Sequence, residues 1–321
     1  MLNNPPILVA DIGGTNARFA LADVVPNIKV SQLEILATED YDSLQEAALA
    51  YLANTTGPRP TTASIAIAGF VANDQVQMTN CPWSFRKSTL AAELDMERIS
   101  VQNDFAAIAC SLPFLTGDDL LQIGSGKIDQ LGNKVVIGPG TGIGVAALAP
   151  VADGWKVLAS EGGHVGFAPA DDLERQILRT VKHKYPRVSV ERIISGQGFS
   201  TLHQALATLR GETAPLMSPK EITREALEDP MSHCGQVVDV FCGILGSFAG
   251  DMAVTFNATG GVYLAGGILP KIQNFFLNSR FRERFEDKGR LTYVKDIPTL
   301  QIKEKQPALV GCAARIEGLY Y

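Results

Sequence analysis

Two glycine-rich stretches and one short polar motif contain the residues of this sequence that could do chemistry. The stretches are "DIGGTNARFAL", which begins at Asp11, and "GPGTGIG", which begins at Gly138. Glycine lets a main chain approach a phosphate closely and threonine adds a hydroxyl, so both stretches could bind phosphate through backbone N–H groups. The polar motif "QND" ends in Asp104, a carboxylate of the kind that accepts a hydroxyl proton during phosphoryl transfer.

The spacing of the glycines excludes the two most familiar nucleotide-binding loops. A Walker A motif needs GxxxxGK followed by Ser or Thr, whereas "GSGK" at 124–127 precedes Ile128. A dinucleotide-binding motif needs GxGxxG before a helix, whereas the alternating glycines at 138–144 precede a segment typical of a strand. From the residues alone, two interpretations stay open: an ordinary glycine-rich hairpin, or a phosphate loop between two strands.

Each polar candidate also has a purely structural interpretation. Asp104 stands where a strand is followed by a helix, so its carboxylate could simply cap the helix N-terminus. His164, in "EGGH", could be a core histidine or a metal ligand beside Glu161, and Glu191, in "VERI", could be a surface charge. The chain has only four histidines and neither HxH nor HExxH spacing, which argues against a metal site.

Alternating strands and helices must position these residues. Apolar runs bounded by turn residues predict strands at "ILVADIGG", "ARFALADV", "TASIAIAGFV" (stopped by Gly69), "KVVIG", "GVAALAP", "WKVLAS" and "GVYLAGGI". Helices are predicted at "SLQEAALAYLANT", from Asn103 or Asp104 onward, and at "DDLERQILRTVKHKY", "EITREALEDP", "LPKIQNFFLNS" and "ALVGCAARIEGL". The alternation indicates the α/β class. Because 7–21 and 135–148 share the order strand, Gly/Thr turn, strand, we expect two duplicated domains whose turns face a common cleft.

Composition and charge limit the classes of partner. The 321 residues suggest one large or two modest domains, and 46% of them are hydrophobic and 19% charged, as in globular proteins. The net charge of -6 and the lack of a basic block argue against nucleic acid and anionic membranes as partners. The start, "MLNNPPILVA", lacks the basic region and apolar run of a signal peptide. The apolar stretch 237–256 contains two aspartates, so a buried core helix is expected there.

The cysteines indicate the redox compartment. Their number is odd and no pair has CxxC spacing: Cys81, Cys110, Cys234, Cys242 and Cys312. Reduced and mostly buried thiols are therefore expected, which fits the cytosol.

Seven motifs occur in order along nearly the whole chain. They are "DIGGTNARFAL", "VQNDFAAIA", "GPGTGIG", "EGGHVGFAP", "ERIISGQG", "YLAGGILP" and "FEDKGR". In these motifs the sequence resembles bacterial glucokinases of the proteobacterial type, within the hexokinase (sugar kinase), actin and Hsp70 superfamily. The zinc-binding CxCGxxGC-like run of the related repressor–kinase family is absent, and so is an N-terminal helix-turn-helix. The implied fold is α/β and two-lobed: a duplicated ribonuclease H-like, sugar kinase/actin-like fold with a central cleft.

The resemblance implies ATP-dependent phosphorylation of glucose at its 6-hydroxyl, which gives glucose 6-phosphate. The family's general base aligns with Asp104. The implied glucose-binding residues are Asn103, Asp104, Gly142, Glu161, His164 and Glu191. A set of fixed polar groups suits a polyol, because an analogue that lacks one hydroxyl leaves a group unpaired.

The resemblance also implies a nucleotide site. Its residues would be Asp11, Gly13, Gly14, Thr15, Asn16, Gly140, Thr141, Gly266 and Gly267. The two turns would bind the phosphates, and the glycine pair would lie against the adenosine, where only glycine leaves room. No metal bound directly by the protein is expected; instead Asp11, a carboxylate at the end of a buried strand, would engage the Mg²⁺ of ATP through water. Arg18 is expected to neutralise phosphate or Asp11. Gly196 is expected to line the nucleotide pocket, and Asn80 to lie near the sugar.

The resemblance also implies the domain boundaries, the oligomeric state and the partners. The small domain would comprise 1–111 plus 303–321 and the large domain 112–302, with closure of the cleft on the sugar. The resemblance implies a cytoplasmic homodimer with neither nucleic-acid nor membrane partners. Three rivals stay open: a kinase for mannose, fructose or an N-acetylated amino sugar; a sugar-responsive regulator without turnover; and a phosphatase-like or actin-like ATPase that needs no sugar.

Overall fold

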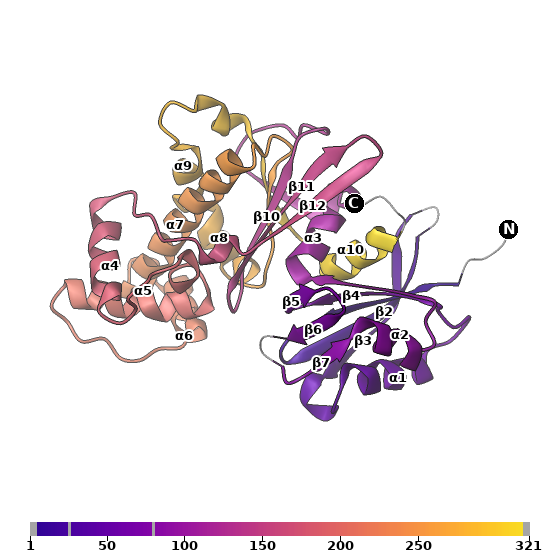
Figure 1. Ribbon diagram of the computed structural model, residues 1–321. Helices are drawn as coiled ribbons and strands as arrows, with labels where there is room; N and C mark the ends of the chain where they lie inside the picture. The colour runs from indigo at the N-terminus through magenta and orange to yellow at the C-terminus, as the bar shows by residue number, and fades with distance from the viewer. Residues whose placement is uncertain (1–4, 25–26, 79–80, 317–321) are drawn as a thin grey trace. The chain divides into compact units, whose positions relative to one another are not determined.

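The computed structural model describes residues 5–24, 27–78 and 81–316. Its contacts group into two compact units (Figure 1). The first unit comprises Met1–Asp119, Leu148–Ala159 and Lys303–Tyr321, and the second comprises Leu120–Ala147 and Ser160–Ile302. The domain boundaries expected from the sequence, after residues 111 and 302, stay a prediction, and residues 317–321 of the expected small domain lie outside the described part.

A five-stranded sheet of order β3-β2-β1-β4-β8 organises the first unit. Its strands are β1 (Ile7–Ile12), β2 (Asn16–Asp23), β3 (Lys29–Ala37), β4 (Thr62–Ile67) and β8 (Arg98–Asn103). β1 pairs antiparallel with β2 and parallel with β4, and β4 pairs parallel with β8. Ile12, Ile67 and Asn103 are in register across these three strands. The turn after β1 and the residue after β8 therefore lie at the same edge of this sheet.

Helices cover both faces of this sheet. α1 (Leu44–Asn54) packs on the face that carries Leu8, Ala10 and Ile12, where Phe19 stacks on Tyr51. α3 (Asp104–Ser111) and α10 (Pro307–Ile316) pack against each other, and α10 contributes to the core on the opposite face of β1. Side chains of one strand alternate between faces, which is why a single apolar strand can serve both layers. α2 (Lys87–Glu93) and a small sheet of β5 (Gly69–Ala72), β6 (Gln75–Met78) and β7 (Ser84–Arg86) complete this region.

The second sheet repeats the strand order of the first. Its order is β12-β11-β10-β13-β14-β9, with β9 (Leu120–Ile123), β10 (Lys134–Pro139), β11 (Ile143–Val151), β12 (Gly154–Ser160), β13 (Val262–Leu264) and β14 (Thr299–Ile302). β10, β13 and β14 run parallel, as β1, β4 and β8 do, and β9 adds an antiparallel edge strand. This repetition is what the similarity between the two glycine-rich hairpins predicted, and the α/β class is confirmed.

A long apolar helix forms the core of the second unit. α7 (His233–Thr255) contacts α5 (Gly196–Leu209), α6 (Pro219–Glu228) and α9 (Phe281–Glu286), and α4 (Asp172–Lys182) contacts α5. Among the described residues α7 is the one helix long and apolar enough to cross a membrane, with a mean hydropathy of 1.6. Because 78% of that apolar window is buried inside the protein, α7 is a core helix, and the expectation for 237–256 is confirmed.

Two expected elements differ from the structure. The helix expected from Leu269 begins as a 3₁₀ turn (Leu269–Ile272) and becomes α8 only over Gln273–Leu277. The strand expected to stop at Gly69 ends at Ile67, and Gly69 instead begins β5. A Cβ at Gly69 would lie 2.6 Å from the Gln77 carbonyl oxygen, so this glycine permits close pairing with β6. The other 3₁₀ turns are Thr38–Asp40, Leu112–Phe114, Gly117–Asp119, Gly162–His164, Val190–Arg192 and Thr292–Asp296.

Candidate active site

The turn between β1 and β2, residues 13–16, is hereafter the first loop. Its ends are joined by a hydrogen bond of 2.9 Å, in which the Gly13 amide donates to the Asn16 carbonyl oxygen. Within the described part of the chain, the amides of Gly14 and Thr15 have no hydrogen-bond partner, and Thr15 is exposed. Free amides on a tight turn form an anion-binding concavity, so the first loop can receive a phosphate.

An ion pair lies at the base of the first loop. Asp11 and Arg18 face each other across β1 and β2, with 3.4 Å between Oδ2 and Nη1. Burial raises the pKa of Asp11, although the neighbouring Arg18 guanidinium lowers it. Arg18 was expected to neutralise either a phosphate or Asp11, and the structure places its guanidinium beside Asp11.

Asn103 and Asp104 begin α3. The Asn103 Oδ1 accepts hydrogen bonds from the amides of Phe105 (2.9 Å) and Ala106 (3.3 Å), so Asn103 is the N-cap. Asp104 is the first residue of the helix, and its Oδ1 accepts from the Phe105 amide at 2.9 Å. The capping role that the sequence left open for Asp104 thus belongs to Asn103.

The carboxyl group of Asp104 has the protonation behaviour of a base that works near neutral pH. Burial raises the pKa of Asp104 to about 6; the Phe105 amide lowers this pKa, and the negative charge of Asp11 raises it further. A general base is most effective when its pKa lies near the working pH. Asp104 is therefore suited to accept a proton from a hydroxyl.

The turn between β10 and β11, residues 140–142, is hereafter the second loop. The Gly140 amide donates to the Gly142 carbonyl oxygen at 2.8 Å, while among the described residues the amides of Thr141 and Gly142 have no partner. Two other segments of the second unit meet this turn. The Gly196 amide donates to the Gly140 carbonyl oxygen at 2.7 Å, and Gly266 lies against Pro139.

Gly266 and Gly267 differ in their surroundings. Gly266 has φ +89°, and a Cβ there would lie 2.5 Å from the Pro139 carbonyl oxygen, so only glycine fits. Nothing lies within 4 Å of a Cβ at Gly267, and both glycines are exposed. The structure therefore gathers four of the expected nucleotide-binding residues of the second unit, Gly140, Thr141, Gly266 and Gly267, and Gly196 with them.

Three of the expected sugar ligands lie together in the second unit. The residues that follow His164 and those that precede Glu191 are joined by an antiparallel bridge between Gly166 and Ser189. The two nitrogens of His164 lie 4.0 Å from Glu161 Oε2 and 4.0 Å from Glu191 Oε1. At 4.0 Å these groups do not satisfy one another as hydrogen-bond partners, so they can receive hydroxyl groups from a ligand.

Glu191 also contacts the second loop. Its Oε2 accepts a hydrogen bond from the Ile143 amide at 3.1 Å, and a Cβ at Gly142 would overlap that same oxygen. Gly142 is therefore part of the cluster that contains Glu161, His164 and Glu191, and it must be glycine for Glu191 to approach.

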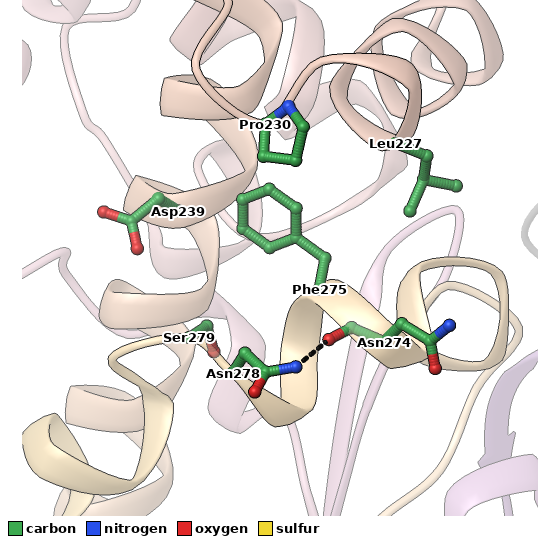
Figure 2. Close-up of a pocket in the computed structure, with 7 residues that line it drawn as sticks. All are labelled: Leu227, Pro230, Asp239, Asn274, Phe275, Asn278 and Ser279. Atoms are coloured by element: carbon green, nitrogen blue, oxygen red, sulfur yellow. Dashed lines mark hydrogen bonds between the residues drawn. The ribbon is translucent and has the colours of Figure 1, made fainter.

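A separate pocket lies elsewhere in the second unit, between the end of α6, the first part of α7 and α8. Figure 2 shows Phe275 of α8 opposite Pro230. The pocket has a volume of about 610 Å³ and is lined by Leu227, Pro230, Asp239, Asn274, Phe275, Asn278 and Ser279. No residue expected from the sequence to bind sugar or nucleotide lines it. Asn80, expected near the sugar, lies outside the described residues.

Comparison with known proteins decides the family. The family model for glucokinase matches residues 8–318. The chain belongs to the glucokinase family. The glucokinase of Saccharophagus degradans is 42% identical over 317 residues, which cover 98% of this chain and 99% of that one. The resemblance seen in the sequence motifs is thereby confirmed, and the chain is a glucokinase-family enzyme.

Solved structures agree with the fold. A glucokinase from an Antarctic psychrotroph has a TM-score of 0.91 and 38% identity, over 98% of this chain and 99% of that one. A ROK-family glucokinase from Streptomyces griseus, solved in complex with glucose and AMPPNP, has a TM-score of 0.64 and 18% identity, over 96% and 98% of the two chains. The duplicated α/β fold of the sugar kinases, expected from the sequence, is confirmed for this member of the glucokinase family.

Proposed function

We propose that this glucokinase-family enzyme transfers the γ-phosphoryl group of ATP to the 6-hydroxyl of glucose. Membership of the family along residues 8–318 carries the proposal. The ligands in the Streptomyces griseus structure, glucose and the ATP analogue AMPPNP, support glucose and ATP as the two substrates of this chain.

Asp104 is the proposed general base. As the bond from the sugar oxygen to phosphorus forms, the hydroxyl proton passes to the Asp104 carboxylate. Two features support this role: the carboxylate is at the first residue of α3, and its pKa of about 6 leaves it ionised yet basic at neutral pH. Asn103, whose Oδ1 is used in capping, would contribute its side-chain amide N–H group to a neighbouring sugar hydroxyl.

The cluster around His164 is proposed to bind the sugar. Glu161 and Glu191 would accept hydrogen bonds from sugar hydroxyls, and His164 would donate or accept one. The side chains of Glu161 and His164 are 78% and 59% exposed, so a ligand can reach them. Gly142 would contact the sugar or the transferring phosphoryl group through its free amide.

The two loops are proposed to bind the phosphates of ATP. The free amides of Gly14 and Thr15, and those of Thr141 and Gly142, are suitable donors to phosphate oxygens. Gly266 and Gly267 would lie against the adenosine.

We propose Mg²⁺ as the metal that accompanies ATP. Magnesium in kinases is held by one or two carboxylates together with substrate phosphates, and Asp11 supplies one carboxylate beside the first loop. Bound with ATP, the ion would neutralise phosphate charge. Asp11 would hold it through water, while Arg18 keeps the Asp11 carboxylate in place at 3.4 Å.

Initial-rate kinetics test the proposed reaction. The purified chain is assayed with ATP and Mg²⁺ against glucose, mannose, fructose and N-acetylglucosamine, with ADP release as the readout and NMR to locate the phosphate. We expect glucose to give the highest kcat/KM, and the phosphate to be on the 6-oxygen. A higher kcat/KM for another hexose, or ATP hydrolysis that needs no sugar, contradicts the proposed reaction. Full activity in the presence of EDTA contradicts the proposed role of Mg²⁺.

The cellular form is also proposed. We infer a cytoplasmic homodimer with two domains, 1–111 plus 303–321 and 112–302. All five cysteines are buried and none of them forms a disulfide in the described structure, which supports a reducing compartment. Sedimentation equilibrium at micromolar concentration tests the dimer, for which a monomer mass is the contrary result, and limited proteolysis tests the domain boundaries.

A further inference from the structure

Thr38 contacts two successive carbonyl groups of the first loop. It is the residue directly after β3, at the start of a 3₁₀ turn, and it is only 6% exposed. Its hydroxyl Oγ1 donates to the Gly14 carbonyl oxygen at 2.9 Å, and its amide donates to the Thr15 carbonyl oxygen at 3.0 Å. Both contacts connect residues that lie more than twenty positions apart, so they fix the loop from outside.

The planarity of the peptide bond makes these contacts relevant to phosphate binding. The Gly14 carbonyl and the Thr15 amide belong to one peptide plane and point in opposite directions. A hydrogen bond that holds the Gly14 oxygen toward Thr38 therefore holds the Thr15 N–H away from Thr38. That N–H is one of the two amides of the first loop without a partner in the described structure.

We propose that Thr38 is a positioning residue, which holds the first loop in the conformation that presents the Thr15 amide to a phosphate of ATP. The inference rests on the proposed function, since it deepens the role of the first loop. Without the Thr38 hydroxyl the peptide plane between Gly14 and Thr15 can rotate, and part of the binding energy of ATP is then spent on restoring its orientation. The backbone contact to Thr15 survives substitution, so the side chain alone is tested.

Four variants separate this role from a general loss of stability. Thr38→Val keeps the shape of the side chain and removes the donor, whereas Thr38→Ser keeps the donor. Thr38→Ala also removes the donor, and it replaces Thr38→Val in the experiment if the valine variant does not fold. The matched control is Thr55→Val, because Thr55 Oγ1 donates to the Leu52 carbonyl oxygen at 2.9 Å, in the same unit and at the end of α1.

The measurements are KM for ATP, KM for glucose and kcat, with the melting temperature of each variant. Loss of one neutral hydrogen bond corresponds to about a 2- to 10-fold change, so Thr38→Val should raise KM for ATP by that factor. KM for glucose should stay at the wild-type value, and Thr38→Ser and Thr55→Val should behave as wild type. Unchanged KM for ATP in both Thr38→Val and Thr38→Ala overturns the inference, and so does an equal rise of both KM values.

ADP binding, measured by calorimetry on the same proteins, keeps this inference apart from the proposed function. Weaker ADP binding by Thr38→Val supports the positioning role even if the wild type phosphorylates a sugar other than glucose. If the wild type phosphorylates glucose and Thr38→Val binds ADP as tightly as the wild type does, the positioning role of Thr38 is contradicted. The proposed function is not affected by that result.

Discussion

The Oε2 atom of Glu191 accepts a hydrogen bond from the Ile143 amide at 3.1 Å, directly after the second loop. The Oε1 atom of the same carboxylate faces Nδ1 of His164 at 4.0 Å. One carboxylate thus contacts both the proposed sugar ligands and the proposed phosphate loop. A sugar that binds Glu191 acts on a group that already holds the second loop in place.

Two substitutions of Glu191 should separate these contacts. In Glu191→Gln the amide oxygen can still accept from Ile143, so we expect a rise in KM for glucose, about 10-fold or more because a charged acceptor is lost. In Glu191→Ala both contacts are lost, and KM for ATP should rise as well. Steady-state kinetics with each substrate varied check this. Equal effects of the two variants on KM for ATP would show that the Ile143 contact is unimportant.

The activity should depend on the ionisation of Asp104. Its pKa is raised to about 6, so the carboxylate is protonated below that pH and cannot accept a proton. We expect kcat/KM for glucose to rise with pH through about 6 and then to level off. Rates between pH 5 and 8, with ATP saturating, provide the measurement. In Asp104→Asn turnover should be lost while glucose affinity changes less; turnover near the wild-type level would exclude Asp104 as the base.

The same pKa predicts an effect on stability. Between the ordinary value of 3.8 and about 6, the folded chain binds the Asp104 proton more tightly than the unfolded chain does, so this group lowers the free energy of unfolding as pH rises. Asp104→Asn removes this effect. At pH 8 the variant should be more stable than wild type, on the order of 1 kcal/mol, and the difference should shrink at pH 4 to 5. Calorimetric unfolding at both pH values checks the sign, and a destabilised variant at pH 8 contradicts it.

Gly266 and Gly267 offer a matched pair of substitutions. Alanine at 266 meets the Pro139 carbonyl oxygen and an unfavourable positive φ, so Gly266→Ala should lower the melting temperature and the activity together. Alanine at 267 has free space, so Gly267→Ala should fold as wild type. If the glycine pair lies against adenosine, KM for ATP should still rise in Gly267→Ala. An unaltered KM for ATP would remove Gly267 from the nucleotide site.

A buried ion-pair cluster between α9 and α4 should contribute more to stability than an exposed ion pair on α4. Arg284, on α9 and 8% exposed, contacts Asp171 at 2.9 Å, Glu174 at 2.5 Å and the Ser247 hydroxyl at 3.0 Å. Arg284→Met would leave Glu174, 3% exposed, as an uncompensated buried charge, at a cost of about 3–5 kcal/mol. The control is Arg175→Met, which removes the exposed pair with Asp172 and should cost under about 1 kcal/mol. Urea unfolding of both variants makes the comparison, and similar costs would contradict it.

Local sequence was sufficient for the elements with regular apolar patterns. The hairpins on either side of the two loops and the helix that begins at Asp104 have strong periodic or turn signals, and they form as predicted. α5 was missed because Gly196 and Gly198 stand at its start, where propensity disfavours a helix. Close packing explains why both positions are glycine. A Cβ at Gly198 would overlap the Ile193 carbonyl oxygen, and a Cβ at Gly196 would lie 3.2 Å from the Gly140 carbonyl oxygen.

Contacts between distant segments were beyond local sequence. Glu191 reaches Ile143 across 48 positions, and its orientation depends on the bridge between Gly166 and Ser189. Thr38 reaches Gly14 across 24 positions and belongs to none of the motifs. Such pairs follow from how the fold brings distant segments together, which no local pattern specifies.

The repeated strand order places β3 and β12 at equivalent positions, next to β2 and β11. The residue after β3 is Thr38, which turns inward and is hydrogen-bonded to its own hairpin. The residue after β12 is Glu161, which is exposed and beside His164. Equivalent positions in the two copies of this sheet therefore differ in role. Thr38 stabilises its own hairpin from inside the protein, whereas Glu161 is exposed and available to a ligand.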